Sequence, residues 1–179
     1  MYRLGESMKL EYLKNKLGFN PETILDIGAH TGQFYGWVKN VWPDSFVWML
    51  EANDSHTEGA SYYKESAYWD IPQLVLEIPK KLQTLDVLFD DNSKFDLIKM
   101  DTQGSELDII KGGLGICKKS SYIILEVAVT EYNLGAPLEL DVINFMENIG
   151  FENIATIGEH VDDDVILQKD ILFKNKEIK

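Results

Sequence analysis

The chain of 179 residues is 45% hydrophobic, which suffices for one hydrophobic core and leaves little room for a second domain, so we expect a single domain over 1–179. Its 17 Lys and Arg residues stand against 30 Asp and Glu, and the net charge of −13 would repel a phosphate backbone, so we expect no nucleic-acid partner. One cysteine, Cys117, excludes a disulfide within the chain, and no apolar run approaches the roughly 20 residues of a membrane span. Because the N-terminus also lacks the apolar core of a signal peptide, a cytoplasmic protein without membrane contacts is expected.

The first third of the chain predicts a covering helix and then two strands joined by a helix. A helix over 7–17 is predicted by Ser7 as its cap, by apolar residues at helical spacing and by Gly18 at its end. Residues 23–27 and 46–50 are apolar runs, and the second is typical of a parallel strand covered on both faces. The helix between them has its apolar side chains at helical spacing, which favours core packing: Phe34, Trp37, Val38 and Val41.

After the second strand the alternation of strands and helices fails. A doubly wound sheet would next need a helix and a strand, whereas residues 53–73 are polar, aromatic-rich and aperiodic. Residues 74–78 predict a short strand and residues 82–89 a short helix. The sequence therefore leaves open whether the sheet lacks one edge strand.

The remainder of the chain predicts a return to alternating elements and a closing hairpin. Residues 95–101 form a strand that ends in an acid, and Ser105 is placed to cap a helix over 106–111. The later elements are a strand at 122–127, a helix from Pro137 to Gly150, and an antiparallel pair at 154–157 and 165–173 joined by a loop over 158–164. The acidic run Asp162–Asp164 in that loop favours a solvated turn over a metal site, because adjacent residues do not converge on an ion.

A glycine loop follows the first strand and starts the next helix. A dinucleotide fingerprint has the form G-x-G-x-x-G, whereas Gly28 and Gly32 enclose three residues and no third glycine follows. The loop therefore fits S-adenosylmethionine better than NAD. Asp26, just before the loop, either fixes the loop backbone or contacts the cofactor, and His30 lies on the loop, where a cofactor-lining role is favoured over catalysis.

Acidic residues end three of the predicted parallel strands. Glu51 is placed where a carboxylate can accept both ribose hydroxyls of a nucleoside. Lys99 and Asp101 are two residues apart on one strand and so share a face, where Asp101 could accept or orient the proton of an acceptor hydroxyl. Lys99 could stabilise a developing oxyanion or merely neutralise Asp101 and Glu126. Glu106 is more simply explained as an acid in the first turn of a helix.

Three blocks of the sequence resemble the FkbM family of class I methyltransferases. They are residues 24–32, 50–53 and 95–113, and the most specific is Lys-x-Asp-x-x-Gly-x-Glu at 99–106 before a helix that ends in Lys-Gly. The resemblance implies an α/β, doubly wound, Rossmann-like sheet, mostly parallel with a C-terminal antiparallel hairpin. It also implies S-adenosylmethionine as cofactor and transfer of a methyl group to oxygen. Family members have a longer helix and a third strand after strand two, so either that strand is lost here or a piece is absent from the sequence.

The resemblance assigns site residues in two groups. Those expected to bind the cofactor are Asp26, Gly28, Ala29, His30, Gly32, Phe34, Glu51, Ala52 and Asn53. Those expected at the reaction centre are Asp101, Lys99 and Glu126. No metal site is predicted, since no His, Asp or Glu set has ligand spacing.

The leading hypothesis is an O-methyltransferase for a hydroxyl of a saccharide or secondary metabolite. Aromatic residues after strand two, such as Tyr62 and Trp69, would suit a sugar or would equally pin a long loop. A degenerate, non-catalytic binding or scaffold domain is the second hypothesis, and an NAD-dependent oxidoreductase is the third. The acceptor and the oligomeric state do not follow from the sequence.

Overall fold

The structure, a computed structural model, describes residues 7–52, 81–131 and 133–178. The strand expected at 74–78, the irregular stretch after strand two with its aromatic residues, and Asn53 lie outside the described residues. The helix expected over 7–17 is α1 (Ser7–Leu17), in which Leu10 and Leu13 are buried while Leu17 is exposed. None of the helices in the described ranges is long and apolar enough to cross a membrane.

The described strands form a six-stranded sheet in the order β2-β1-β3-β4-β6-β5. Strands β1 to β4 pair in parallel, and β6 pairs antiparallel with both β4 and β5. The predicted mostly parallel sheet with a C-terminal antiparallel hairpin is therefore confirmed. The bounds are β1 Thr23–Ile27, β2 Phe46–Leu50, β3 Leu97–Met100, β4 Tyr122–Ala128, β5 Phe151–Asp162 and β6 Val165–Asn175.

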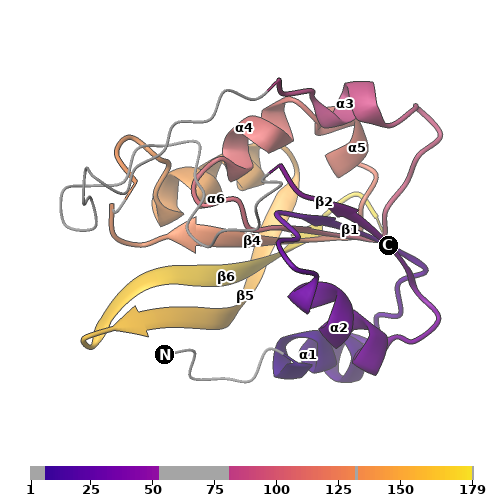
Figure 1. Ribbon diagram of the computed structural model, residues 1–179, viewed down its shortest axis with the longest axis horizontal. Coiled ribbons are helices and arrows are strands. Elements are labelled where there is room, and N and C mark those ends of the chain that lie inside the picture. The colour runs from indigo at the N-terminus through magenta and orange to yellow at the C-terminus, as the bar shows by residue number, and fades with distance from the viewer. Residues whose placement is uncertain (1–6, 53–80, 132, 179) are drawn as a thin grey trace.

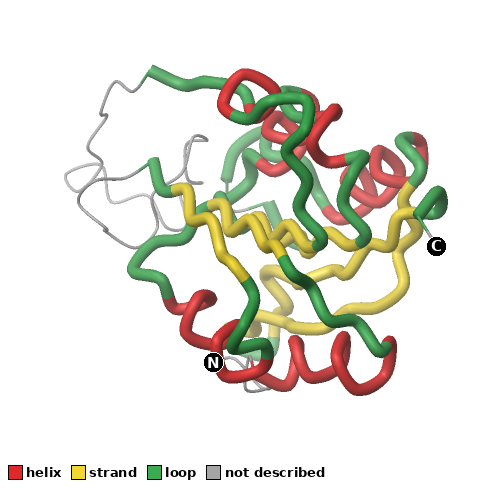
Figure 2. The backbone as a smooth tube through the Cα atoms, turned by 90° about the vertical axis from the view of Figure 1, so that its right-hand side faces the viewer, coloured by secondary structure: helices red, strands yellow, loops and turns green. Residues whose placement is uncertain are grey.

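Helices cover both faces of this sheet, as Figure 1 shows from one side and Figure 2 after a quarter turn. Helices α1 and α2 (Gln33–Val41) lie against one face, and the other four lie against the opposite face. The two layers enclose two separate apolar clusters, one on each face. The helices on the second face are α3 (Leu85–Leu88), α4 (Glu106–Lys111), α5 (Leu114–Cys117) and α6 (Glu139–Asn148).

Alternation along the central strands explains how polar groups come together at one edge. On β3, Leu97 belongs to the α1–α2 cluster, and Ile98 and Met100 belong to the opposite one. Because successive side chains point to opposite faces, Lys99 and then Asp101, beyond the end of β3, follow Leu97 on the α1–α2 side. The same alternation places Glu126 of β4 on that face, so apolar side chains give way to charged ones toward the carboxyl ends of the strands.

Strand β2 is less buried than expected. The sequence predicted a strand covered on both faces, but Phe46, Trp48 and Met49 are 59%, 49% and 48% exposed. The prediction of burial was wrong because β2 is the edge strand of the described sheet and pairs only with β1 among its strands.

The closing hairpin is longer than predicted and its loop is shorter. Strand β5 continues to Asp162, and Asp163 and Asp164 alone form the turn, with φ angles of 43° and 64°. Two central residues with positive φ are the mark of a type I′ turn, for which Asn-Gly or Asp-Gly is the usual sequence signal. The pair Asp-Asp lacks that signal, so the sequence predicted a seven-residue loop. Helix α5 was also not predicted, since Gly112 and Gly113 marked the end of a helix rather than a break between two.

Gly28, just after β1, allows a close approach to the backbone of Asp101 at the end of β3. Its φ is 77°, and a Cβ atom there would lie 1.8 Å from the backbone oxygen of Asp101. No side-chain rotamer can relieve a clash with backbone, so position 28 requires glycine for two independent reasons.

We expect Gly28→Ala to lower the free energy of unfolding by at least about 2 kcal/mol, because it adds a backbone clash to an unfavourable φ. The control is Gly36→Ala within α2, where a Cβ meets nothing within 4 Å. That substitution should stabilise the protein by about 0.5–1 kcal/mol through helix propensity. Urea denaturation of both variants measures the difference, and equal midpoints would contradict the close approach at Gly28.

Candidate active site at the carboxyl ends of the strands

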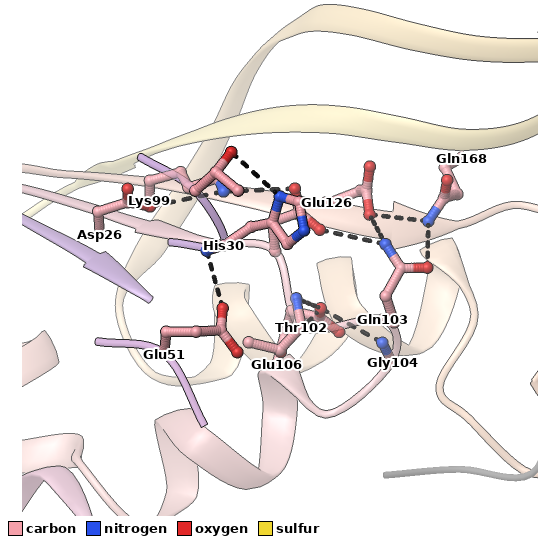
Figure 3. A network of polar contacts seen from close by, with 12 residues as sticks. Asp26, His30, Glu51, Lys99, Thr102, Gln103, Gly104, Glu106, Glu126 and Gln168 are labelled. Carbon is pink, nitrogen blue, oxygen red and sulfur yellow. Dashed lines mark hydrogen bonds and ion pairs between the residues drawn. The ribbon is translucent and has the colours of Figure 1, made fainter. Parts of the chain in front are cut away.

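The glycine loop is held by hydrogen bonds to the end of β2. The backbone N–H groups of Gly28 and Ala29 donate to the carbonyl oxygen of Leu50 at 2.9 and 3.1 Å. The N–H of His30, whose φ is 46°, donates to Glu51 Oε2 at 2.8 Å. The loop is therefore tied to the end of β2 by backbone and by a carboxylate, which Figure 3 shows for His30 and Glu51.

Glu51 thus supports the glycine loop. The sequence predicted this carboxylate as the ligand of two ribose hydroxyls, and at least its Oε2 atom is engaged by the loop backbone. The ribose contact stays a prediction. Ala52 is exposed beside it, and Asn53 falls outside the described residues.

Lys99 lies between two carboxylates. Its Nζ is 3.5 Å from Asp26 Oδ1 and 3.3 Å from Asp101 Oδ2, and it lies 5.6 Å from the centre of the Phe34 ring. Burial lowers the pKa of Lys99, but the charges of Asp101 and Asp26 raise it more, so the amine stays protonated. Burial, with a smaller effect from the charges of Asp101 and Glu51, raises the pKa of Asp26 above its usual value, although Lys99 acts to lower it.

Asp101 and Glu126 are neighbouring carboxyl groups that affect each other's ionisation. Burial and the neighbouring charge of Asp101 raise the pKa of Glu126 well above its ordinary value. Burial acts to raise the pKa of Asp101, but Lys99, Glu126 and Gln103 together outweigh it, so this pKa is lowered. Asp101 is therefore the more readily ionised of the two carboxyl groups.

Two glutamine amides donate hydrogen bonds to these carboxyl groups. Gln103 Nε2 donates to Asp101 Oδ1 at 3.2 Å and to Glu126 Oε2 at 2.8 Å, and Gln168 Nε2 donates to the same Glu126 oxygen at 2.7 Å. In Figure 3 both amides are turned toward Glu126. The sequence analysis missed both glutamines. Gln168 could have been found from the alternation of side chains along a strand, because it lies four residues before Leu172 and so shares its face of β6.

Glu106 holds the loop after β3 in place. Its Oε1 accepts from the backbone N–H of Thr102 at 2.8 Å and of Gly104 at 3.3 Å, and from the Thr102 hydroxyl at 3.0 Å. The predicted cap, Ser105, makes no capping bond, and its hydroxyl donates back to Thr102 O instead. The structural interpretation of Glu106 is therefore supported. The prediction of a Ser105 side-chain cap was wrong, because Ser105 has φ −92° and ψ 8° instead of the extended backbone of a capping residue.

These groups surround a cavity of about 130 Å³ between the glycine loop and the strand ends. Among the predicted site residues it is lined by Gly28, Ala29, His30, Phe34, Lys99, Asp101 and Glu126. Asp26, Gly32, Glu51 and Ala52 are not among its lining residues. Ligand pockets usually exceed roughly 300 Å³, so the described residues enclose only part of a nucleoside-sized ligand.

The side chains that line the cavity are of two chemical kinds. Leu10, Phe34 and Trp37 from α1 and α2, with Ile124 and Ile157, are apolar. Lys99, Asp101, Glu126 and Asp170 are charged or acidic, and of these the sequence analysis did not single out Asp170. Asp170 lies opposite Glu126 in the register of β4 and β6, which only the antiparallel pairing determines. The cavity therefore joins a backbone loop suited to a cofactor to a carboxylate pair suited to proton transfer.

The fold is similar to several solved methyltransferase structures. One is an S-adenosylmethionine-dependent methyltransferase from Clostridium acetobutylicum, with TM-score 0.59, 11% identity and coverage of 94% of this chain and 90% of that chain. Another is the magnesium protoporphyrin IX methyltransferase of Synechocystis with bound S-adenosylmethionine, with TM-score 0.57, 11% identity and coverage of 95% and 77%. A third is a putative RNA methyltransferase from Pyrococcus horikoshii, with TM-score 0.53, 15% identity and coverage of 98% and 86%.

At these identities the structural matches establish the fold, which is the Rossmann-like fold of class I methyltransferases. A search among curated proteins found no match. The sequence profile of the methyltransferase FkbM domain matches residues 10–152, which include the glycine loop, Glu51, the 99–106 motif and Glu126. The chain belongs to the FkbM methyltransferase family.

Proposed function

We propose that this protein is an O-methyltransferase that acts on a hydroxyl group of a saccharide or another small polar metabolite. The observation that carries the proposal is the Asp101–Glu126 pair beside Lys99, which places an ionised carboxylate in the cavity next to the glycine loop. S-adenosylmethionine is the cofactor that family membership and fold indicate, and when bound it supplies an electrophilic methyl group on sulfur. The backbone of Gly28, Ala29 and His30 and the ring of Phe34 are the groups that would hold it.

Asp101 is the residue suited to receive the acceptor's proton. Its side chain is one third exposed, whereas Glu126 is 6% exposed and has a raised pKa. Asp101 would take the proton that the acceptor hydroxyl loses when it is methylated. Lys99 keeps Asp101 ionised and oriented before the reaction, since it is itself fixed between two carboxylates.

The apolar and acidic side chains of the cavity support a saccharide-like acceptor. The indole of Trp37 and the ring of Phe34 offer flat apolar faces, and Asp101, Glu126 and Asp170 offer hydrogen-bond acceptors for hydroxyl groups. A pyranose has one apolar face and a rim of hydroxyl groups, so it matches both kinds of side chain. The acidic side chains disfavour phosphorylated acceptors.

The expectation that nucleic acid is no acceptor rests on the net charge of −13 and stays a prediction. Since one structural neighbour is a putative RNA methyltransferase, RNA belongs among the acceptors to be tested. No observation favours an NAD-dependent oxidoreductase, because the glycine spacing and the family both indicate a methyltransferase.

Calorimetric titration with S-adenosylhomocysteine separates the enzyme from a degenerate binding domain. We expect measurable binding to the full chain, because the loop backbone is preorganised by Leu50 and Glu51. Glu51→Gln should weaken binding about tenfold, since a weaker acceptor for the His30 N–H loosens the loop. Absence of heat at millimolar ligand would favour the degenerate domain.

We expect Asp101→Asn to reduce methyl transfer by about 10²-fold or more, because the amide cannot accept the acceptor's proton. The rate is measured as formation of S-adenosylhomocysteine in the presence of a panel of sugars and polyols. Asp108→Asn, which changes an exposed carboxylate in the first turn of α4, is the matched control and should retain the wild-type rate. Full activity of Asp101→Asn would remove Asp101 from the mechanism.

The raised pKa of Glu126 predicts a pH-dependent stability. The folded protein holds this proton more tightly than the unfolded chain, whose value is near 4.5, so the contribution of Glu126 is present below that pH and is lost as pH rises through the folded-state pKa. Glu126→Gln cannot ionise, so its free energy of unfolding should rise relative to that of the wild type as pH rises above about 4.5. Free energies of unfolding from urea denaturation that change equally with pH in the two proteins would contradict a raised pKa of Glu126.

A further inference from the structure

We propose that Gln103 is a positioning residue that fixes the orientation of the Asp101 carboxylate toward the acceptor hydroxyl. The inference rests on the proposed role of Asp101 in methyl transfer. It adds the side chain that holds the second oxygen of this carboxylate, and it gives a reason for a glutamine in the tight loop after β3.

The register of the sheet places two acids side by side. Met100 and Leu125 are paired residues of the parallel strands β3 and β4, and Asp101 and Glu126 are the residues that follow them. Neighbouring strands lie about 4.8 Å apart, so two carboxyl groups at the same level are close enough to share one donor. Because buried acceptors need partners, a donor that reaches both carboxyl groups stabilises this arrangement.

The orientation of the Asp101 carboxylate is not set by its own side chain. The last torsion of an aspartate side chain has a broad, roughly two-fold preference, so hydrogen-bond partners determine the plane of the carboxylate. Lys99 Nζ donates to Oδ2 at 3.3 Å, and Gln103 Nε2 donates to Oδ1 at 3.2 Å. One donor at each oxygen fixes the plane. A carboxylate offers about four lone-pair positions, so capacity remains for the acceptor hydroxyl.

The Gln103 amide is itself fixed by its other contacts. Its Nε2 also donates to Glu126 Oε2 at 2.8 Å, and its Oε1 accepts from Gln168 Nε2 at 3.4 Å. A primary amide has two N–H groups and one carbonyl oxygen, so every polar group of this side chain has a partner. Figure 3 shows the amide between Glu126 and Gln168. Rotation of the amide would break contacts to three side chains.

The backbone of the loop after β3 presents this amide to the strand ends. Gln103 has a φ of 56°, and Gly104 after it has a φ of 105°. Glu106 Oε1 accepts from the N–H groups of Thr102 and Gly104 at 2.8 and 3.3 Å. The backbone oxygen of Gln103 accepts from Nδ2 of the buried Asn133 at 2.8 Å. A left-handed conformation is unfavourable for a residue with a side chain, so these contacts maintain it.

Glutamine supplies N–H donors without adding a charge. An amide donor also favours the ionised form of the carboxylate that accepts from it, and the ionised form is the one that can take a proton. A glutamate at position 103 would lack the donors and would add a negative charge. The titratable groups around Asp101 and Glu126 are already mostly acidic: Asp26 on β1, His30 in the glycine loop, Lys99 on β3, Glu106 on α4 and Asp170 on β6.

Steady-state kinetics of Gln103→Met test the positioning role. Methionine has a side chain of similar length without N–H groups, so Oδ1 of Asp101 loses its donor. We expect kcat to fall about tenfold, with the KM of the acceptor and the affinity for S-adenosylhomocysteine within about twofold of wild type, because orientation acts on the transition state. Gln83→Met, the same substitution at an exposed position, should leave all three unchanged. A wild-type kcat in Gln103→Met would overturn the inference.

Crystal structures of the wild type and of Gln103→Met test the orientation directly. We expect one orientation of the Asp101 carboxylate in the wild type and a rotated or second orientation in the variant. The same single orientation in both proteins would overturn the inference. Should Gln103→Met not fold, Gln103→Glu keeps the shape of the side chain and at neutral pH only accepts hydrogen bonds, so it is expected to turn the Asp101 carboxylate away.

The two measurements separate this inference from the proposed function. If the wild type methylates none of the acceptors offered, the proposed function fails, while the crystal structures still decide whether Gln103 orients Asp101. A lower kcat in Gln103→Met with an unmoved Asp101 carboxylate would show a merely structural role for Gln103 and would overturn the inference.

Discussion

Lys99 is the positive charge on which the arrangement of acids at the strand ends depends. Asp26, Asp101, Glu126 and Asp170 lie on one face of four adjacent strands, and burying several carboxylates without compensation would be strongly unfavourable. Lys99 offsets the charge of its two nearest carboxylates, and the raised pKa of Glu126 makes that group easier to bury in its neutral form. The result is a site in which the carboxyl group of Asp101 lines the cavity with Lys99 beside it. Removing Lys99 would change the protonation of the whole row rather than delete one contact.

Acids also organise the backbone around the cavity. Glu51 holds the N–H of His30, and Glu106 holds the N–H groups of Thr102 and Gly104. Both loops contain residues with positive φ, which are costly to fix in a flexible chain. A carboxylate that accepts these backbone N–H groups holds each loop in its conformation. The acids at the strand ends therefore divide into those that hold loops and those that face the cavity.

The sheet brings these groups together through the register of its neighbouring strands, parallel for β1 with β3 and antiparallel for β4 with β6. Asp26 lies opposite Lys99, and Glu126 lies opposite Asp170, although these residues are far apart in the chain. Gly28 allows β1 and the end of β3 to approach so closely that a methyl group would not fit between them. The functional residues thus depend on the sheet geometry more than on any helix.

Local sequence determined the element types, the glycine loop and the acids that follow the strands, because periodicity, Gly28 and the 99–106 motif act over a few residues. It also indicated the family, and hence the fold and the methyl donor. Tertiary structure alone decided what those acids do: whether Glu51 and Glu106 bind backbone, which carboxyl group has a raised pKa, and which glutamines donate hydrogen bonds to it. It also decided the exposure of β2 and the two-residue turn at Asp163, which depend on strand order and on backbone angles without a local signal. The physical reason is that hydrogen-bond partners and burial are set by residues distant in the chain, which adjacent sequence does not specify.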